Sequence, residues 1–509
     1  MLKIFFLILF VKSVLSTNIL FVTLLASPSH HIWNEALVDG LLKYDYNITM
    51  VSHFPATIKH KNYTLHHVDA NLLLEYLDGN FIKEVSQDST LLAVLAPWKY
   101  TPFMCRYCFE SDEYKKILNY PKDFFDLLVF DVTFAHCFFP LIDYFGKPPV
   151  IGITAFGMQP YISDIIGQRI ESYSPYYNLP YTNKMTFFER FYSFIHQKID
   201  LLSKWYYLEE VTEESKRFFG KNILNLDEYE KSISLIFSND DPIMDYPKAF
   251  PPNVIPIGGV HLKEPKKLEG DLQKIMDDSK NGVILVSMGS NFKADHYSDD
   301  VKSALIEAFS RLKLTILWKF EDELKVSKNV YLRRWLPQRD ILAHPNTKLF
   351  ITHCGGLSTQ ETIVRGVPVV GIPLFMDQYN KAAKFKATKS GIILKYSELT
   401  ADIIFDGVNE VLSNPEYKEN MMRLSNLYKN QPQKPIDKFL IWVDYVLKNG
   451  HLDHLSVSAR YMKWYQVDNW DIFGFCLVIL FVTLYVFKKV CCFVSKCFKR
   501  NSSGKQKMH

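Results

Sequence analysis

A loop at residues 350–361, FITHCGGLSTQE, brings a histidine, two glycines, hydroxyl groups and a carboxylate together directly after an apolar run. Gly355 and Gly356 let the backbone approach a ligand closely. Ser358 or Thr359 is expected to cap a helix that begins there, which leaves free N–H groups pointing outward. Exposed amides at a helix N-terminus form an anion site, typically for phosphate. The loop therefore predicts phosphate binding, although a lone loop of this kind is also compatible with a plain turn.

His353 and Glu361 add chemistry on either side of that helix start. The histidine can give a bound phosphate a hydrogen bond or a positive charge. Glu361 is expected on the first turn, where it would repel phosphate but can accept hydrogen bonds from sugar hydroxyls. This combination suits a nucleoside diphosphate with its ribose. We predict no metal site, because the loop lacks further ligands and Cys354 has no partner in it.

Four polar or aromatic residues at the neighbouring strand ends strengthen this interpretation. Trp335 and Gln338 precede the loop in WLPQ, and Asp377 and Gln378 follow the next strand in PLFMDQ. An indole offers a flat face to a base, and a carboxamide can read its polar edge. Singly these are a core tryptophan, a surface glutamine and a helix-capping aspartate. Together, at successive strand ends, they predict a cradle for a nucleotide-sugar.

A second cluster follows the first apolar run of the chain, in LLASPSHHIW. His30 and His31 stand at the start of a helix for which Ser27 or Ser29 can act as the cap. Asp131 ends a later strand, DLLVFD. A histidine whose tautomer is fixed by a carboxylate can act as a general base. Spacing does not choose between the two histidines, and a structural bond and a strand-end cap are the ordinary alternatives.

These residues need parallel sheets to bring them together, and the apolar pattern predicts two. Strand-like runs occupy 18–26, 47–52, 126–131 and 150–154 in the first half, and 282–290, 314–320, 329–336, 349–354, 368–373 and 391–396 in the second. Nearly continuous Val/Ile/Leu strands separated by helical stretches indicate parallel sheets covered on both faces. We predict two doubly wound, Rossmann-like α/β domains, with ligands beyond the carboxyl ends of the strands.

The expected domain order follows from composition. An N-terminal domain (17–250), a linker rich in Pro, Gly and Lys (251–270) and a C-terminal domain (271–433) precede C-terminal helices and a juxtamembrane segment (434–468). The stretch 171–194 is unusually aromatic. It can fill the core, line an apolar pocket, or form a surface that rests on a membrane.

Both ends of the chain carry targeting signals. Residues 1–16 are expected to be a secretory signal peptide. Residues 469–489 are expected to span a membrane once, and the basic tail 490–509 would stay in the cytosol by the positive-inside rule. Lys505 and Lys507 resemble a dilysine signal for retrieval to the endoplasmic reticulum. We therefore predict a type I protein of that membrane with a luminal body.

The charge distribution argues against a nucleic-acid-binding protein, and the cysteines and sequons suggest possible modifications. Residues 488–509 hold seven basic and no acidic side chains, so the remaining body has 52 basic against 55 acidic residues. Such a body lacks the basic excess of a nucleic-acid binder. Cys105 and Cys108 can form a local disulfide, which the sequence leaves open. Predicted modifications are palmitoylation at Cys491, Cys492 or Cys497 and N-glycosylation at Asn47 and Asn62.

The segment from Trp335 to Gln378 resembles the signature of the UDP-glycosyltransferases, with the same spacing of Trp, Gln, His, Glu and Asp-Gln. Weaker similarity extends from SPSHHIWNEALVDGLL to the C-terminal tail. The resemblance implies the two-domain GT-B fold and inverting hexosyl transfer from a UDP-sugar co-substrate, without another cofactor. The implied acceptor is small and lipophilic. The oligomeric state, including a homo-oligomer, stays open.

The resemblance also assigns roles. His30 would be the base, supported by Asp131. Trp335 would stack on uracil, Gln338 would contact the nucleoside, and Glu361 would hold the ribose. The donor sugar would be bound by Asp377 and Gln378. The diphosphate would be held by Ser287, His353 and the amides of Gly355, Gly356 and Ser358.

Two departures from the family pattern affect the donor site. Leu357 stands where plant members carry Asn, so a phosphate contact there must come from the backbone. Lys248 stands where glucuronosyl members commonly have Arg, which favours glucose over glucuronate because lysine lacks a bidentate fork. The competing hypothesis is a membrane-anchored protein that binds a nucleotide-sugar or a lipophilic ligand without catalysis. A nicotinamide-dependent oxidoreductase is disfavoured, since no Gly-x-Gly-x-x-Gly follows the first strand.

Overall fold

The computed structural model describes residues 16–76 and 90–504. The predicted signal peptide therefore lies outside the described residues except for its last position, and so do Lys505 and Lys507.

The first domain is built on a sheet of seven parallel strands in the order β3-β2-β1-β4-β5-β6-β7. The strands are β1 (Asn18–Val22), β2 (Asn47–Ser52), β3 (Tyr63–His67), β4 (Leu127–Asp131), β5 (Val150–Thr154), β6 (Ile233–Ser238) and β7 (Val254–Pro256). Along β1, Leu20 and Val22 enter one hydrophobic core while Ile19 and Phe21 enter another. Because side chains alternate along a strand, the sheet is covered on both faces.

The second domain repeats this plan with six parallel strands in the order β10-β9-β8-β11-β12-β13. They are β8 (Val283–Ser287), β9 (Thr315–Lys319), β10 (Val330–Arg333), β11 (Thr347–Thr352), β12 (Val369–Gly371) and β13 (Gly391–Ile393). All six predicted strands of this half are confirmed. In the first half β3, β6 and β7 were not predicted, and β7 extends the first sheet into the segment expected to be a linker.

Helices surround both sheets. Those of the first domain include α2 (Pro28–Leu42), α4 (Thr90–Glu110), α5 (Asp112–Lys115), α6 (Leu141–Tyr144), α7 (Pro160–Ile165), α8 (Phe187–Phe219) and α9 (Leu226–Glu230). Later helices are α10 (Gly270–Asp278), α11 (Asp299–Arg311), α12 (Gln338–Ala343), α13 (Gly356–Arg365), α14 (Gln378–Ala387), α15 (Ala401–Ser413), α16 (Pro415–Lys429) and α17 (Pro435–Asn449). Short 3₁₀ helices lie at Lys116–Asn119, Ala135–Phe138, Ala294–His296, Tyr396–Glu398, Asp453–Leu455 and Ser458–Tyr461.

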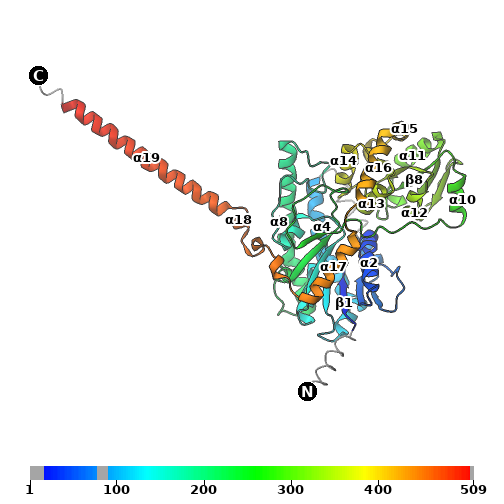
Figure 1. Cartoon of the computed structure of the whole chain (residues 1–509), viewed down its shortest axis with the longest axis horizontal. Helices are drawn as coiled ribbons and strands as arrows, with labels where there is room; N and C mark the ends of the chain where they lie inside the picture. The colour runs from blue at the N-terminus through cyan, green and yellow to red at the C-terminus, as the bar shows by residue number, and fades with distance from the viewer. Residues whose placement is uncertain (1–15, 77–89, 505–509) are drawn as a thin grey trace, which may run out of the picture. The chain divides into compact units, whose positions relative to one another are not determined.

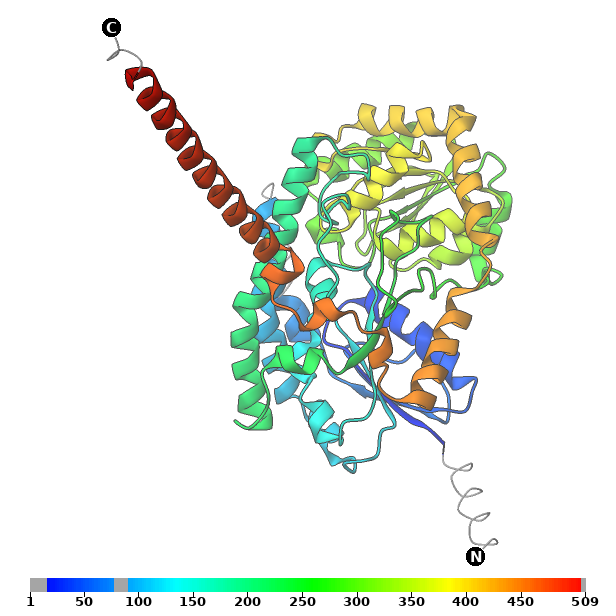
Figure 2. The same ribbon diagram turned by 60° about the vertical axis from the view of Figure 1, so that its left-hand side comes forward.

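Helix α17 follows the second domain in sequence but packs on the first (Figures 1 and 2). Its residues Phe439 and Val443 are buried in the same core as Trp33 and Leu37 of α2. A Cβ added at Gly40 would lie 2.5 Å from Ile436, so the two helices touch closely at that glycine. The chain therefore returns to the first domain after completing the second.

Residues 457–509, with 167–169, form a separate unit. It contains α18 (Trp464–Val467) and α19 (Trp470–Gly504), and an ion pair joins Arg169 to Asp468 at 3.3 Å. Within α19, residues 470–498 are long and apolar enough to cross a membrane, and none of this span is buried within the protein.

Candidate active site

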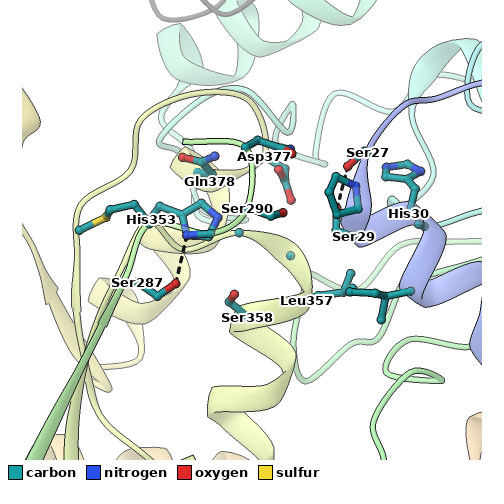
Figure 3. A pocket seen from close by; sticks show the side chains of 18 of the residues that line it. Ser27, Ser29, His30, Ser287, Ser290, His353, Leu357, Ser358, Asp377 and Gln378 are labelled. Atoms are coloured by element: carbon teal, nitrogen blue, oxygen red, sulfur yellow. Dashed lines mark hydrogen bonds between the residues drawn. The ribbon is translucent and has the colours of Figure 1, made fainter. Parts of the chain in front are cut away.

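A cavity of about 520 Å³ is lined by residues from both sheets. It receives the loops after β1, β4 and β5 from the first domain and those after β8, β11 and β12 from the second. Figure 3 shows His30 on one side, His353 with Ser287 on the other, and Asp377 between them. Of the twelve predicted catalytic and donor-binding residues, all except Asp131 line this cavity. The rule that ligands lie beyond the carboxyl ends of parallel strands accounts for this gathering.

His30 projects from the first turn of α2, which begins at Pro28 with Ser27 as its N-cap residue. The Ser27 side chain makes no capping bond to the helix and instead lies 3.0 Å from the Ser29 hydroxyl (Figure 3). The predicted position of the helix start is confirmed, but the predicted side-chain cap is not formed.

Asp131 lies behind His30 and is fully buried. Its Oδ2 is 3.4 Å from His30 Nδ1 and accepts a hydrogen bond from Asn34 at 3.3 Å. Its Oδ1 accepts the backbone N–H of Thr133 at 3.1 Å. The Phe156 ring packs edge-on against the imidazole, with centroids 4.6 Å apart. A carboxylate at Nδ1 favours the tautomer that leaves Nε2 unprotonated, the form that can accept a proton.

His31, the alternative that spacing left open, is occupied elsewhere. Its Nδ1 lies 2.8 Å from the Ser52 hydroxyl and its Nε2 lies 3.1 Å from the carbonyl oxygen of Pro55. Burial lowers its pKa, although Glu35 opposes that effect. His31 does not line the cavity. The geometry therefore distinguishes the two histidines where the sequence could not.

His353 sits between two glycines of the second domain. A Cβ at Gly289 or Gly355 would lie 2.6 or 2.4 Å from its Nε2, and Gly289 has φ +82°, so both positions need glycine. His353 also hydrogen-bonds the backbone of Ser287 (Figure 3). Burial lowers the pKa of His353 to about 4, so the ring is uncharged near neutral pH. Of the two contributions expected from His353, the structure favours a hydrogen bond over a positive charge.

Helix α13 begins at Gly356, with Gly355 as an uncapped N-cap residue in extended conformation. The prediction that Ser358 or Thr359 caps the helix is wrong, because both lie inside it. Its first amides are still free of helical partners, as at any helix start. The backbone of Gly356 hydrogen-bonds Asp377, and Leu357 lines the cavity with an apolar side chain, as the sequence implied.

Gln338 joins α13 to the loop that carries Trp335. Its Nε2 donates to the Ser358 hydroxyl at 3.0 Å and to Glu361 at 2.7 Å. Glu361 is the sixth residue of α13, so the prediction that it lies in the first turn is wrong. Burial raises the pKa of Glu361, and the bond from Gln338 opposes that rise. Trp335 is 67% exposed, which leaves its indole face open to a ligand.

Asp377 and Gln378 stand at the junction of β12 and α14. Burial raises the pKa of Asp377 to about 6, while the nearby His30 and the Gly356 backbone act in the opposite direction. Gln378 is buried, and its Oε1 accepts the N–H groups of Leu374 and Phe375 at 2.8 and 3.1 Å. Its amide NH₂ group remains as the part suited to donate to a ligand.

The sequence reasoning missed Lys319 and Ser290, which also line the cavity. Lys319 ends β9, so the strand-end rule could have found it. Its Nζ donates to the carbonyl oxygen of Gly289 at 3.0 Å and pairs with Glu321 at 2.6 Å. Among the residues that the structure describes, no group of three or more His, Cys, Asp or Glu side chains is placed to hold a metal.

The aromatic stretch 171–194 does not line the cavity. Tyr176 is buried in a core, whereas Phe187, Phe188 and Phe191 are exposed on α8, so core filling and surface display are both present. The apolar-pocket interpretation of this stretch is therefore wrong for the cavity described above.

None of the first domain's cysteines or sequon asparagines is among the residues that line the cavity. Cys105 pairs with Cys137, and Cys108 is a buried free thiol, so the local Cys105–Cys108 pair is not formed. Asn47 is half-buried and its side-chain amide donates to Asn18 at 3.0 Å, while that of Asn62 donates to the Asp45 carbonyl at 3.4 Å. Glycosylation at Asn47 and Asn62 stays a prediction. Cys491, Cys492 and Cys497 are exposed on α19, and their palmitoylation also stays a prediction.

Solved structures share this architecture. A glycosyltransferase of kitacinnamycin superposes with a TM-score of 0.56 over 84% of this chain and 99% of its own, at 16% identity. A UDP-glucosyltransferase from Polygonum tinctorium that is capable of glucosylating indoxyl superposes with a TM-score of 0.55 over 86% of this chain and 99% of its own, at 17% identity. At such low identity these likenesses establish the fold alone, which is GT-B as predicted.

Sequence relatives establish the family. Residues 41–506 match the family model described as "UDP-glucoronosyl and UDP-glucosyl transferase". UDP-glucosyltransferase 2 of Dactylopius coccus is 31% identical over 477 residues, covering 91% of each chain. UDP-glucuronosyltransferase 1A9 of Mus musculus is 31% identical over 414 residues, covering 80% of this chain and 77% of its own. The chain belongs to this family and is a UDP-glycosyltransferase, an enzyme that moves a glycosyl group from a UDP-sugar.

Proposed function

We propose that the protein transfers a hexosyl group, with inversion at the anomeric carbon, from a UDP-sugar to a small lipophilic acceptor. The observation that carries the proposal is that His30 and Asp377, from different domains, line one cavity. A base on the acceptor side thereby faces the group expected to hold the donor sugar.

The proposed base is His30. With Asp131 at Nδ1, the imidazole can take the acceptor's hydroxyl proton at Nε2 while the acceptor oxygen bonds to the anomeric carbon. UDP leaves from the opposite face as that bond forms, which inverts the configuration. General-base assistance of this kind typically contributes about 10²–10⁴-fold in rate. Asp131 acts as the positioning residue, because it touches His30 rather than the substrate.

The first turn of α13 is the proposed diphosphate site. Gly356, Leu357 and Ser358 line the cavity, and the amides of this turn that have no partner can stabilise the negative charge that develops on the departing UDP, whereas the Gly356 backbone is hydrogen-bonded to Asp377. Trp335 can stack on uracil, and Glu361 with Gln338 can hold the ribose and nucleoside. UDP-sugar acts in this scheme as a co-substrate, and we assign no other cofactor.

The cations near the cavity favour UDP-glucose over UDP-glucuronate. Lys248 does not line the cavity, and its Nζ is held by Asp240 at 3.1 Å and the Met158 carbonyl at 3.2 Å. Lys319 and Arg339 do line it, but each is paired with a carboxylate. A glucuronate carboxylate would thus meet Asp377 without an unpaired cation among the described lining residues, which like-charge repulsion disfavours.

The acceptor side is apolar. It is lined by Leu25, Ile32, Leu74, Pro97, Tyr100, Met104, Phe134 and Phe156. Such a surface suits lipophilic molecules with one nucleophilic group, in keeping with the apolar character of small-molecule sites in general. The apolar span in α19 and the basic residues after it support a single-pass protein of the endoplasmic reticulum membrane, with a luminal body and a cytosolic tail.

One experiment tests donor, acceptor and base together. Microsomes containing the protein are incubated with labelled UDP-glucose or UDP-glucuronate and a panel of phenols and steroids. We expect turnover with UDP-glucose, loss of about 10²-fold or more in His30→Ala, and near-normal turnover in the matched variant His31→Ala. Binding of UDP-sugar without any transfer would favour the non-catalytic binding protein instead, and near-normal transfer by His30→Ala would remove His30 as the base.

A further inference from the structure

We infer that Asn239, which lies outside the loops that carry His30 and His353, is a positioning residue. It keeps His30 of the first domain aligned with helix α13 of the second. The inference rests on the proposed function, because it concerns the alignment of His30 with the donor. Asn239 follows β6 directly and is only 4% exposed. It does not line the cavity, so any effect on transfer must act through its neighbours.

Towards the first domain, Asn239 fixes the loop after β5. Its backbone N–H donates to the carbonyl oxygens of Thr154 and Phe156, at 3.1 and 3.0 Å. Its side-chain Nδ2 donates to the Ala155 carbonyl at 2.8 Å. Ala155 and Phe156 both line the cavity, and the Phe156 ring packs against His30. One residue thus holds the backbone that supports the imidazole.

Towards the second domain, Asn239 holds α13. Its Oδ1 accepts the Gln360 side-chain N–H at 3.0 Å and the backbone N–H of Gly259 at 3.1 Å. Gln360 is 2% exposed and projects from α13, the helix whose first turn is the proposed diphosphate site. At the far end of α13, the Arg365 side chain donates to the Lys263 carbonyl at 2.9 Å, and Lys263 lies in the same connecting segment (251–270) as Gly259. The donor helix is therefore anchored at Asn239 as well as within its own domain.

The network continues to Asp131, the carboxylate that positions His30. The Thr154 hydroxyl accepts the Phe156 N–H at 3.2 Å and lies 2.9 Å from the Thr133 hydroxyl. The Thr133 N–H in turn donates to Asp131. Hydrogen bonds therefore run without a break from Asp131 to Gln360, and Asn239 is the point at which they cross between the domains.

A buried network of hydrogen bonds favours one arrangement of its members, because a shifted partner would leave further polar atoms unsatisfied. Here the arrangement specified is the distance between the base and the donor helix. Since misplacement by about 1 Å can cost about 10²-fold in rate, loss of Asn239 is expected to reduce turnover much more than donor binding. A UDP site confined to the second domain would keep its own contacts.

The test compares Asn239→Ala, Asn239→Asp, Gln360→Ala and the double alanine variant in the full chain, with Asn329→Ala as the matched control. Asn329 is also a structural asparagine, whose Nδ2 donates to the carbonyls of Phe309, Leu312 and Leu314, but it lies outside the network. We expect kcat to fall by about 10–100-fold in Asn239→Ala while the Kd for UDP changes by less than about threefold. Asn239→Asp keeps the acceptor for Gln360 and should retain part of the activity.

The Gln360→Ala loss should largely disappear in the Asn239→Ala background, since both variants break one connection. Additive losses, or a kcat within about twofold of wild type in a folded Asn239→Ala variant, would overturn the inference. If Asn239→Ala does not fold, a kcat within about twofold of wild type in both Gln360→Ala and Asn239→Asp would overturn the inference instead.

Hydrogen exchange provides a readout that does not need turnover. UDP bound at α13 should slow exchange of the Phe156 amide in the wild type, and this effect should vanish in Gln360→Ala while UDP still binds. Unchanged coupling in that variant would also overturn the inference. A wild type that binds UDP and shows the coupling but transfers no sugar would contradict the proposed function and leave the network intact, so the two failures are distinguishable.

Discussion

His30 lies in the first turn of α2 in the first domain and Asp377 directly before α14 in the second, yet both line one cavity, and His30 lies near enough to Asp377 to lower the pKa of that carboxyl. Burial outweighs this influence and raises the pKa of Asp377 to about 6. The proposed base and the proposed sugar-binding group are therefore electrostatically linked across the domain boundary. Two predictions rest on this pair.

Donor-sugar binding should weaken as pH falls through about 6, because a protonated Asp377 loses acceptor capacity for sugar hydroxyls. The effect should be seen with UDP-glucose and be nearly absent with UDP, which lacks the sugar. Calorimetric titration of both ligands between pH 5 and 8 measures it. An equal pH dependence for UDP and UDP-glucose would contradict the prediction.

Asp377→Asn should stabilise the empty protein at neutral pH while abolishing transfer. The folded-state pKa of about 6 exceeds the ordinary value of 3.8, so the ionised group costs stability above pH 6. Removing that charge should gain up to about 3 kcal/mol, and the gain should shrink as pH falls from 6 towards 4. Thermal unfolding at several pH values is the measurement; a variant less stable than wild type at pH 7.5 would count against the buried charge.

Asp200 provides an independent pH prediction in the acceptor domain. It is buried on α8, and burial raises its pKa to about 8, although the neighbouring side chains of Tyr176, Trp98 and Lys204 act in the opposite direction. Folding therefore takes up a proton between about pH 4 and 8, so stability falls as pH rises through that range. Asp200→Asn should flatten this slope. Parallel stability curves for variant and wild type would show that Asp200 is ionised in the folded state.

The Cys105–Cys137 disulfide closes a loop between positions 32 residues apart. On the loop-entropy estimate its loss should cost about 3–4 kcal/mol. Cys137→Ser should therefore lower the unfolding midpoint, and Cys108→Ala, which removes only a free buried thiol, should retain the crosslink. Peptide mapping without reduction identifies the bonded pair, and a Cys105–Cys108 peptide would contradict the assignment.

Trp335→Ala should weaken UDP binding without destabilising the fold, because the indole is largely exposed. Stacking on a base contributes about 1–3 kcal/mol, so the Kd should rise by about 5- to 150-fold. The matched control is Trp205→Ala, an exposed tryptophan on α8 outside the cavity. Equal UDP affinity in wild type and Trp335→Ala would show that the base binds elsewhere.

The apolar pattern predicted the strands of the second domain, and the strand-end rule predicted that the candidate donor residues gather at one place; their roles in binding the donor stay predictions. The runs that contain these six strands are rich in Val, Ile and Leu, and residues at or just after the carboxyl ends of β8, β9, β10, β11 and β12 line the cavity. In the first half, the edge strand β3 contains polar residues, and β7 is only three residues long within a proline-rich stretch. Neither shows the continuous apolar pattern of a central parallel strand.

Other features depend on tertiary contact and left no local signal. Gly355, rather than a hydroxyl residue, precedes α13, because the close packing of His353 fixes the backbone there. Cys137 reaches Cys105 only once the first domain has folded. Asn239 reads as an ordinary turn residue in SNDD, and only the folded chain shows that it bonds both domains.

Because α17 packs on α2, the polypeptide passes between the first and second domains twice, once before α10 and once after α16. We expect two connections to limit how far the two domains can separate. A chimera that joins the first domain of this protein to the second domain and C-terminal part of a relative would therefore place the relative's α17 against α2 of this protein. A fragment that stops before residue 434 would expose the apolar side of α2 around Trp33 and Leu37 to water, so we expect it to aggregate unless the return helix is supplied.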